Sequence, residues 1–352
     1  MTGECVFNRL GLLEYFIGGV ATGQQRHQTT FSCARVAPGV VTSAHVRAPG
    51  KAILFGEHAV VYGEGAIAIA LSMHFETRVR VSRSDTTRVD GRPMDRKHHG
   101  YFAEAVERVW GDRGPLEIST TSSIPSSSGL GSSAALTVST VGALRLLRGR
   151  LAQEEVARDG FEVEYAVQGR ASPTDTSASS HGRAIYIARE PGEQLLWTIE
   201  RPPARWCVHN LEFAPMNFVV GYTGKKGNTG ELVERVRRGT EKSPEARAYI
   251  MEIGALVEDA RGALRKGDAV RVGELMTRNH KLLEKLGVSS PDLERLIAAA
   301  APHALGAKLT GAGGGGCMIA LTTEPDACAR AIDAAGGKAY RAQIDPDGVV
   351  AL

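Results

Sequence analysis

The chain has 352 residues, enough for one large domain or two of ordinary size, and its 43% hydrophobic and 23% charged residues are typical of a globular protein with a substantial core. The net charge is only +3, so we expect neither a nucleic acid nor a membrane surface as a partner. The five cysteines are scattered and form no CxxC pair, which argues against a disulfide framework or a zinc ribbon and favours a cytoplasmic protein.

The first forty residues differ from the rest of the chain because they show no sustained hydrophobic period. We expect residues 1–40 to be a poorly ordered extension that the fold does not need. Their most apolar stretch, LGLLEYFIGGVA, is interrupted by Glu14 and is shorter than the roughly 18 residues that a membrane helix requires.

A regular pattern of strands and helices begins at Val41. The segments AILF and AIAIALSM predict two short strands around the turn GEHAVVYGEG, YFAEAVERVW (101–110) predicts an amphipathic helix, and LEISTTS predicts a strand. A loop rich in Ser and Gly then leads into an apolar helix over 133–148. A further helix over 153–169 is broken by SPTDTSASS, after which RAIYIA predicts a strand.

The pattern of predicted strands and helices changes near PPARW (202–206). We place the domain boundary there, between a domain over 41–205 and a domain over 206–352. In the second domain NFVVGYT predicts a strand, and LTGAGGGGCMIAL predicts a strand, a glycine turn and another strand. Between them the pattern predicts helices over 230–238, 245–266, 268–286 and 291–301.

The loop SSIPSSSGLGSSAAL (122–136) holds more serines and glycines than a simple turn needs. Its segment from Gly129 to Ala134 fits the GxGxxA pattern of dinucleotide-binding folds, but Pro125 and three serines make the loop longer than the tight strand-to-helix turn of such folds. A flexible linker is the other ordinary interpretation, and the helix that follows at once weakens it. Successive amides at a helix N-terminus, which glycines leave open to close approach, suit a phosphate group.

Two more motifs accompany this loop. The first is APGKAILFGEHAVVYGEGAIAIAL (48–71); alone, its Lys51 would most often be a surface charge and its Glu57-His58 pair part of a turn. The other is GAKLTGAGGGGCMIAL (306–321), which has six glycines from Gly306 to Gly316. Such a tract is either a β-turn or a backbone platform pressed against a ligand.

In this order and at this spacing, the three motifs resemble those of the GHMP kinases, and the resemblance runs from about Val41 to the C-terminus. The first motif and the run SPTDTSASS are similar to those of mevalonate kinases within this superfamily, the archaeal ones in particular. The resemblance implies an α+β fold of two domains, the first like ribosomal protein S5 domain 2 and the second ferredoxin-like. ATP and mevalonate would meet in the cleft between them.

The resemblance also implies a role for each matching residue. Asp175 would be the catalytic carboxylate and Lys51 the lysine beside it. Ser133 and Glu164 would bind Mg²⁺. The residues at the mevalonate site would be Glu57, His58 and Thr229. The residues that would bind ATP are Pro125, Ser126, Ser127, Ser128, Gly129, Leu130, Gly131, Ser132, Ser133, Lys308, Gly311 and Gly313.

The chemistry of a small-molecule kinase needs these residue types. The attacking alcohol is protonated at neutral pH, so a carboxylate such as Asp175 is needed to orient the hydroxyl and accept its proton. A neighbouring Lys51 would keep that carboxylate ionised. Serine and glutamate oxygens suit a hard cation that bridges the phosphates. Glu164 lies 11 residues before Asp175 with Pro173 between them, so the helix that carries Glu164 must end before Asp175.

The implied reaction converts ATP and mevalonate to 5-phosphomevalonate and ADP, an early step of isoprenoid biosynthesis, and relatives are often homodimers. Two alternatives stay open: another GHMP kinase, acting on phosphomevalonate or homoserine, and an inactive relative that senses a ligand. Lys225, Lys226 and Arg183 are basic residues that a phosphorylated substrate would use. Against an inactive relative, all four proposed catalytic and metal-binding residues are present. His181 and Arg183 depart from the plainer residues that relatives often carry after the serines.

Overall fold

The computed structural model describes residues 6–7, 13–14, 41–125, 128–169, 171–227 and 229–352, and the chain divides into two compact units, Met1–Val40 and Val41–Leu352. In the first unit, β1 (Val6–Phe7) and β2 (Leu13–Glu14) pair antiparallel. The rest of the extension expected over residues 1–40 lies outside the described residues. Ser126 and Ser127, which we expected to bind ATP, also lie outside them.

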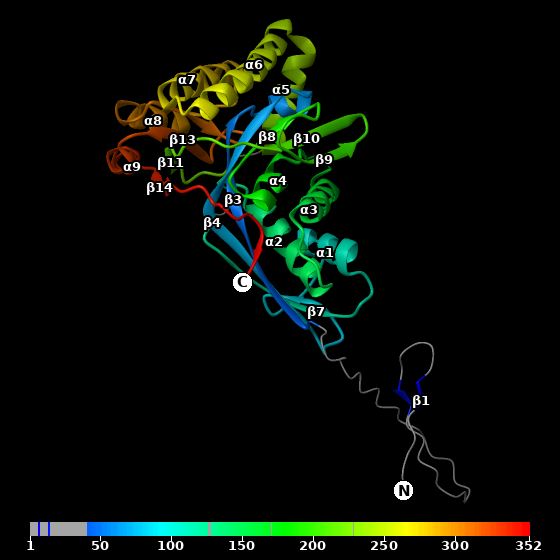
Figure 1. Cartoon of the computed structure of the whole chain (residues 1–352). Helices are drawn as coiled ribbons and strands as arrows, with labels where there is room; N and C mark the ends of the chain where they lie inside the picture. The colour runs from blue at the N-terminus through cyan, green and yellow to red at the C-terminus, as the bar shows by residue number, and fades with distance from the viewer. Residues whose placement is uncertain (1–5, 8–12, 15–40, 126–127, 170, 228) are drawn as a thin grey trace, which may run out of the picture. The chain divides into compact units, whose positions relative to one another are not determined.

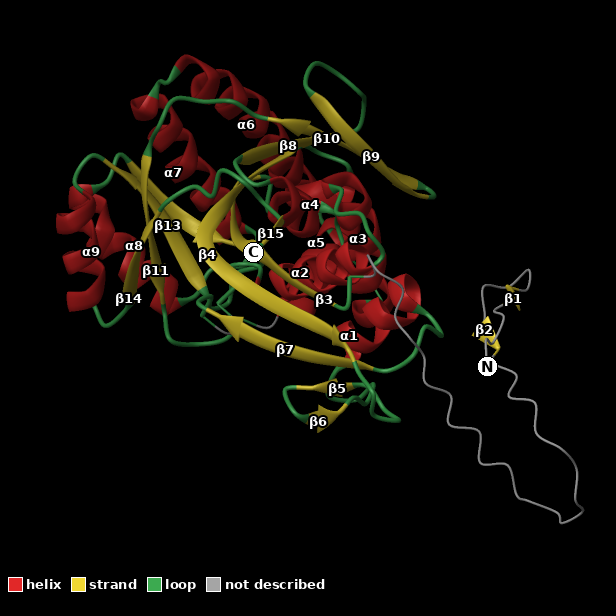
Figure 2. Cartoon of the chain, turned by 60° about the horizontal axis from the view of Figure 1, so that its bottom comes forward, coloured by secondary structure: helices red, strands yellow, loops and turns green. Residues whose placement is uncertain are grey.

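A nine-stranded sheet is the framework of the first half of the second unit (Figures 1 and 2). Its long central pair is the antiparallel β3 (Ser43–Phe55) and β4 (Ala66–Val81), so the two predicted short strands are the adjoining ends of much longer ones. The sheet continues from β4 in one direction through β7 (Leu116–Ser122) to β5 (Arg88–Val89) and β6 (Arg92–Pro93). In the other direction it continues through β8 (Ala184–Ala188), β10 (Ala204–Asn210) and β9 (Leu195–Arg201), while β15 (Val350–Ala351) pairs with β3.

Four helices gather on one side of the β3–β4 pair (Figure 1). They are α1 (Gly100–Ala105), which continues as a π-helical turn over Val106–Trp110, α2 (Ser132–Leu147), α3 (Gln153–Gln168) and α4 (Thr174–His181). The predicted helices over 101–110, 133–148 and 153–169 are thereby confirmed. The run SPTDTSASS does end α3, but it is itself helical from Thr174, because its small residues bury well against the sheet and Pro173 is tolerated at a helix start.

The second half contains a four-stranded antiparallel sheet in the order β12 (Gly306–Thr310), β13 (Cys317–Thr322), β11 (Asn217–Tyr222) and β14 (Lys338–Ala342). Its helices are α5 (Thr229–Lys242), α6 (Pro244–Lys266), α7 (Ala269–Lys285), α8 (Pro291–Ala300) and α9 (Pro325–Ala334). The four helices predicted here are confirmed. Ser243, Asp268 and Ser290 cap α6, α7 and α8 by accepting backbone N–H groups, which explains where these helices begin.

The two halves share one large hydrophobic cluster, in which Phe55, Ile67 and Leu71 of β3 and β4 pack in the same core as Phe218 and Ile319 of the smaller sheet. The hairpin of β9 and β10 was not predicted, and β10 runs across the expected boundary at residues 205 and 206 while pairing with β8 and β9. We therefore propose that the boundary lies later, in residues 211–216 between β10 and β11.

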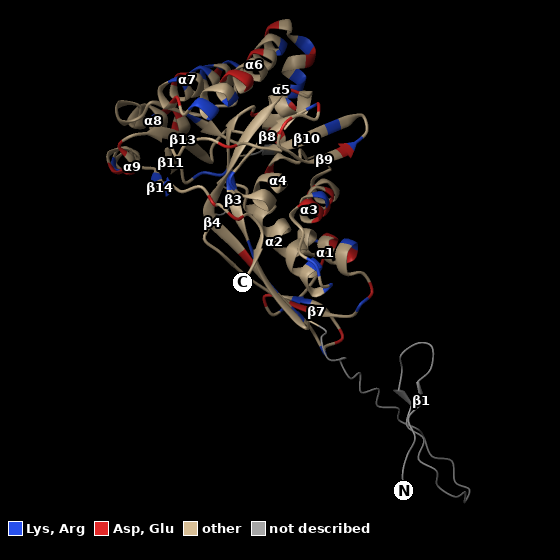
Figure 3. Ribbon diagram, viewed as in Figure 1, with Lys and Arg blue, Asp and Glu red and all other residues tan. Residues whose placement is uncertain are grey.

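Charged residues of both signs are mixed along the outer helices α5–α7 (Figure 3). Many of them form exposed pairs, such as Arg237 with Glu234 at 2.7 Å, and such pairs contribute little to stability. No helix in the described part of the chain has both the length and the apolarity of a membrane span.

Candidate active site

The Ser/Gly loop joins the end of β7 to the N-terminus of α2. Ser128 is fully buried, and its hydroxyl donates to the carbonyl of Pro125 at 2.8 Å. Gly129 and Gly131 have φ angles of 85° and 74°, a conformation that favours glycine, and Gly131 is the N-cap of α2. The loop thus presents backbone amides and the positive end of a long helix, the arrangement that suits a phosphate.

Lys51 links this loop to α4. It lies in β3 and is 3% exposed, and its backbone N–H donates to the carbonyl of Leu130 at 2.9 Å. Its ammonium donates to the carbonyl of Gly129 at 3.1 Å and lies 3.1 Å from Oδ2 of Asp175, in the first turn of α4. The side chain of Asp175 is 32% exposed, so the buried lysine holds a carboxylate that is still open to a substrate.

Glu164 of α3 is buried beside this pair, and its Oε1 has no hydrogen-bond partner. Burial and the negative charge of Asp175 raise the pKa of the Glu164 carboxyl to about 8, although a hydrogen bond with Ser133 and the charge of Lys51 oppose the shift. The carboxyl groups of Glu164 and Asp175 both lie near Lys51, and Oε1 of Glu164 has no hydrogen-bond partner. A hard cation would satisfy that oxygen, so the residues present fit a magnesium ion.

Tyr101 was missed by sequence reasoning. Its phenol oxygen accepts a hydrogen bond from the side chain of Gln168 at 3.1 Å, and burial together with the charge of Glu164 raises the pKa of this phenol. Tyr101 is at the start of α1, 32 residues before Ser133. The amphipathic pattern indicates only that Tyr101 belongs to a helix, and nothing in the sequence places it near the active site.

Glu57 and Lys308 form a fully buried ion pair between the two halves of the unit. The second carboxylate oxygen of Glu57 accepts a hydrogen bond from Asn279 of α7 at 3.1 Å, and the Lys308 ammonium also donates to the carbonyl of Leu309 at 2.7 Å. Burial lowers the pKa of Lys308, and the negative charge of Glu57 opposes that shift. Lys308 is 0% exposed, which does not fit the direct contact with ATP that we expected.

His58 follows in the turn after β3 and has a φ of 62°, which is unusual for a residue with a side chain. Its Nε2 donates to the carbonyl of Ala312 at 3.1 Å, and burial lowers the pKa of the ring. The Glu57-His58 turn is therefore joined at two points to the third motif, by Lys308 and by Ala312.

The glycine tract Gly311–Gly316 packs against the Ser/Gly loop. A Cβ atom at Gly316 would lie 2.7 Å from the carbonyl oxygen of Ser128, and one at Gly313 would lie 2.0 Å from that of Val288. Next to the tract, Thr310 exchanges hydrogen bonds of 2.9 and 3.0 Å with the backbone of Ile53 in β3. The tract is a rigid platform held from outside, because only glycine allows these close approaches.

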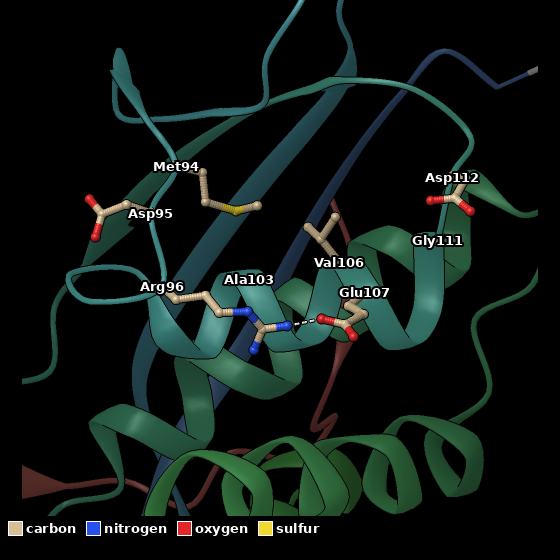
Figure 4. A pocket seen from close by; sticks show the side chains of 8 residues that line it. All are labelled: Met94, Asp95, Arg96, Ala103, Val106, Glu107, Gly111 and Asp112. Carbon is tan, nitrogen blue, oxygen red and sulfur yellow. Dashed lines mark hydrogen bonds and ion pairs between the residues drawn. The ribbon is translucent and has the colours of Figure 1, made fainter.

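The remaining expected residue, Thr229, begins α5, and its side chain lies outside what the structure describes. The structure brings together Lys51, Asp175, Glu164 and Ser133, and it places the glycine tract next to them. A separate pocket of about 570 Å³ lies along α1, where Arg96 and Glu107 form an ion pair (Figure 4). Its lining contains none of the expected site residues.

A second cluster of possible metal ligands lies between α7 and α8. One nitrogen or oxygen atom from each of His280, Glu284 and Glu294 lies within 4.8 Å of the other two. The ring Nδ1 of His280 accepts the backbone N–H of Leu309 at 3.4 Å, so the proton of the neutral ring is on Nε2, which donates to Glu294 at 3.0 Å. The cluster is thus a hydrogen-bonded link between two helices.

Comparison with known proteins identifies the family to which this fold and site belong. The sequence matches the family model of the GHMP kinases N terminal domain over residues 98–183 and that of the GHMP kinases C terminal domain over residues 260–342. The fold is therefore the two-domain α+β fold of the GHMP kinases. The mevalonate kinase of Pyrococcus abyssi is 38% identical over 338 residues, which cover 86% of this chain and 96% of that protein. The chain belongs to the mevalonate kinase family of GHMP kinases.

Solved structures agree with this assignment. The Methanococcus jannaschii mevalonate kinase matches with a TM-score of 0.72 and 26% identity, covering 87% of this chain and 99% of that one. The L. major mevalonate kinase in complex with R-mevalonate matches with a TM-score of 0.72 and 27% identity, covering 85% of this chain and 95% of that one.

Proposed function

We propose that this protein is a mevalonate kinase, which transfers the γ-phosphoryl group of ATP to the 5-hydroxyl of mevalonate and releases 5-phosphomevalonate and ADP. Family membership makes ATP the expected phosphoryl donor. The observation that carries the proposal is the Lys51–Asp175 pair, with a separation of 3.1 Å, held by its lysine directly against the Ser/Gly loop.

The Ser/Gly loop, from Pro125 to Ser133, binds the phosphates of ATP. Its glycines allow oxygen atoms to approach the backbone amides, and the N-terminus of α2 attracts negative charge. Gly311 and Gly313 support this site as parts of the platform that packs under the loop. Lys308 acts at a distance by holding Glu57, in place of the ATP contact first expected.

Asp175 orients the 5-hydroxyl of mevalonate and accepts its proton during the transfer. Lys51 pairs with Asp175 at 3.1 Å and places a positive charge near the oxygen that is being phosphorylated. The Lys51 ammonium also donates a hydrogen bond to the carbonyl of Gly129. This one side chain therefore sets the distance between the mevalonate hydroxyl at Asp175 and the loop that holds ATP.

Ser133 and Glu164 would hold Mg²⁺, and the unpartnered Oε1 of Glu164 is the observation that supports this ligand pair. When bound, the ion would neutralise negative charge on the phosphates.

We assign the mevalonate site to His58 and Thr229, and Glu57 is the buried anchor of the turn that carries His58. His181 and Arg183 lie at the other end of α4 from Asp175, where His181 bonds Asn210 at 2.9 Å and Arg183 bonds the carbonyl of Pro346 at 3.2 Å. They therefore serve the fold around α4. The same proposal includes a homodimeric enzyme of the cytoplasm.

The test is an assay of ADP release in which mevalonate, phosphomevalonate, homoserine and galactose are compared as acceptors. We expect turnover with mevalonate at a kcat/KM well above that for the other three. A clear preference for phosphomevalonate or homoserine would assign the site to another GHMP kinase. ATP binding without turnover of any acceptor would assign it to a ligand-sensing relative.

A further inference from the structure

The C-terminal segment of the chain returns from the smaller sheet to the catalytic half. After β14, the carbonyl of Gln343 accepts the backbone N–H of Ser72 at 2.8 Å, and Ile344 forms a bridge with Leu71 of β4. The chain then ends as β15, which pairs with Val46 and Arg47 at the far end of β3. Residues 345–349 cross between these two attachments, and we call them the C-terminal crossing.

Asp345 ties the crossing to the strand pair that carries Lys51. Its backbone N–H donates to the carbonyl of Ala70 at 3.1 Å, and Ala70 is the residue opposite Lys51 in the β3–β4 ladder. Its side chain is buried, and Oδ2 accepts a hydrogen bond from His74 of β4 at 2.7 Å. Hydrogen bonds from His74 and from the backbone N–H groups of Gly348 and Asp347 outweigh burial and lower the pKa of Asp345.

The same residue ties the crossing to the helix that carries Asp175. Oδ1 of Asp345 accepts the N–H groups of Asp347 at 3.0 Å and Gly348 at 2.8 Å, which turns the chain back toward α4. After this turn, the N–H of Val349 donates to the carbonyl of Ser180, in the last turn of α4, at 3.1 Å. The carbonyl of Asp345 accepts the N–H of Arg183, just beyond the helix, at 2.6 Å.

The fit between the crossing and α4 leaves no space for adjustment. A Cβ atom at Gly348 would lie 2.3 Å from the carbonyl oxygen of Ser180, and one at Gly182 would lie 2.4 Å from the backbone nitrogen of Gly348. Ser180 is five residues from Asp175 in the same short helix, about 7.5 Å along its axis. A shift of the crossing would therefore be transmitted to the carboxylate of Asp175.

We propose that Asp345 is a positioning residue for phosphoryl transfer: it holds the C-terminal crossing between β4 and the end of α4, and so fixes Asp175 relative to Lys51. This inference rests on the role of Asp175 in the proposed function. A displacement of about 1 Å at a reacting group can lower a rate by roughly a hundredfold. Asp345 is buried and is not among the proposed substrate-binding residues, so its loss should lower kcat and leave nucleotide binding intact.

The experiment compares Asp345→Ala with Asp345→Asn, which keeps an acceptor for the two backbone N–H groups. Asp347→Ala is the matched control, because Asp347 lies on the same crossing and its side chain makes an exposed contact with Arg47 at 3.2 Å. For each full-length variant we would measure kcat, the KM for ATP, the stoichiometry of ADP binding by calorimetry, and thermal unfolding. The acceptor is whichever substrate the wild type phosphorylates, so an incorrect mevalonate assignment is revealed by the wild type alone.

We expect Asp345→Ala to lower kcat by roughly tenfold or more with unchanged KM for ATP and unchanged ADP stoichiometry, whereas Asp345→Asn keeps most of the activity and Asp347→Ala keeps all of it. If Asp345→Ala does not fold, Gly348→Ala tests the same coupling between the crossing and α4, because its added Cβ would lie 2.3 Å from the carbonyl oxygen of Ser180. An unchanged kcat in the folded variant, or a fall in kcat that only follows a loss of ADP-binding sites, would overturn the proposal.

Discussion

The contact between the Ser/Gly loop and Lys51 can be tested by Gly131→Ala. Gly131 has a φ of 74°, and a residue with a side chain in the left-handed conformation costs roughly 1–2 kcal/mol. The new Cβ would also lie 2.8 Å from Cγ and 3.2 Å from Cε of Lys51. The lysine must therefore move, and its ammonium with it, which now lies 3.1 Å from Asp175.

We expect Gly131→Ala to lower the free energy of unfolding by about 1–2 kcal/mol and to lower kcat by roughly tenfold to a hundredfold, because the lysine loses its position beside the carboxylate. Urea denaturation measures the first effect and steady-state ADP release with mevalonate measures the second. Both are needed, since strain alone predicts a loss of stability without a loss of turnover in the folded protein.

Gly149→Ala is the matched control. Gly149 follows α2 at its other end and has a φ of 91°, but no atom lies within 4 Å of where its Cβ would be. It should lose a similar stability of about 1–2 kcal/mol and keep the wild-type kcat. Equal kcat values for the two variants would refute the reasoning, because the clash with Lys51 would then have no catalytic consequence.

Three further predictions follow from the buried groups and the N-terminal segment. Glu164→Gln should raise the Mg²⁺ concentration needed for half-maximal rate and weaken Mg²⁺-dependent ADP binding in calorimetry, while the KM for mevalonate changes less; the opposite pattern would place Glu164 at the acceptor. Lys308→Met should destabilise the fold by about 3–5 kcal/mol because it leaves the Glu57 charge buried and unpaired, and adding Glu57→Gln should recover much of that loss in urea denaturation. Deletion of residues 1–40 should leave the melting temperature and the activity unchanged, and a fall of several degrees would show that this segment belongs to the fold.

The helices from Val41 onward, apart from α4 and α9, and the longer strands around the three motifs could be predicted because each follows a hydrophobic period or lies beside a glycine-rich turn. The sequence failed at α4 for a physical reason: Thr174–His181 has low hydrophobic contrast, and its helical state depends on burial of small polar residues among α2, α3 and the sheet. The hairpin of β9 and β10 was not predicted because the change in sequence pattern near Pro202 was interpreted as a domain boundary. That proline pair forms the turn between the two strands.

The candidate site divides in the same way. Lys51, Asp175, Glu164 and Ser133 could be named because they occur within or near motifs, and the structure brings their side chains together. Lys308 is a basic residue within the glycine-rich third motif, so the sequence suggests that it binds ATP. Only the tertiary packing shows that its ammonium is buried against Glu57. Tyr101 and Asp345 act through contacts between distant parts of the chain, which one sequence does not reveal.

The central claim is that Asp175, held by Lys51, accepts the proton of the mevalonate hydroxyl. Asp175→Asn keeps the shape of the side chain and removes its basicity, and the direct measurement is kcat for mevalonate phosphorylation alongside ATP binding by calorimetry. The account predicts a kcat lower by roughly 10²–10⁴-fold with ATP binding largely unchanged. An Asp175→Asn enzyme that retains most of the wild-type kcat would contradict it.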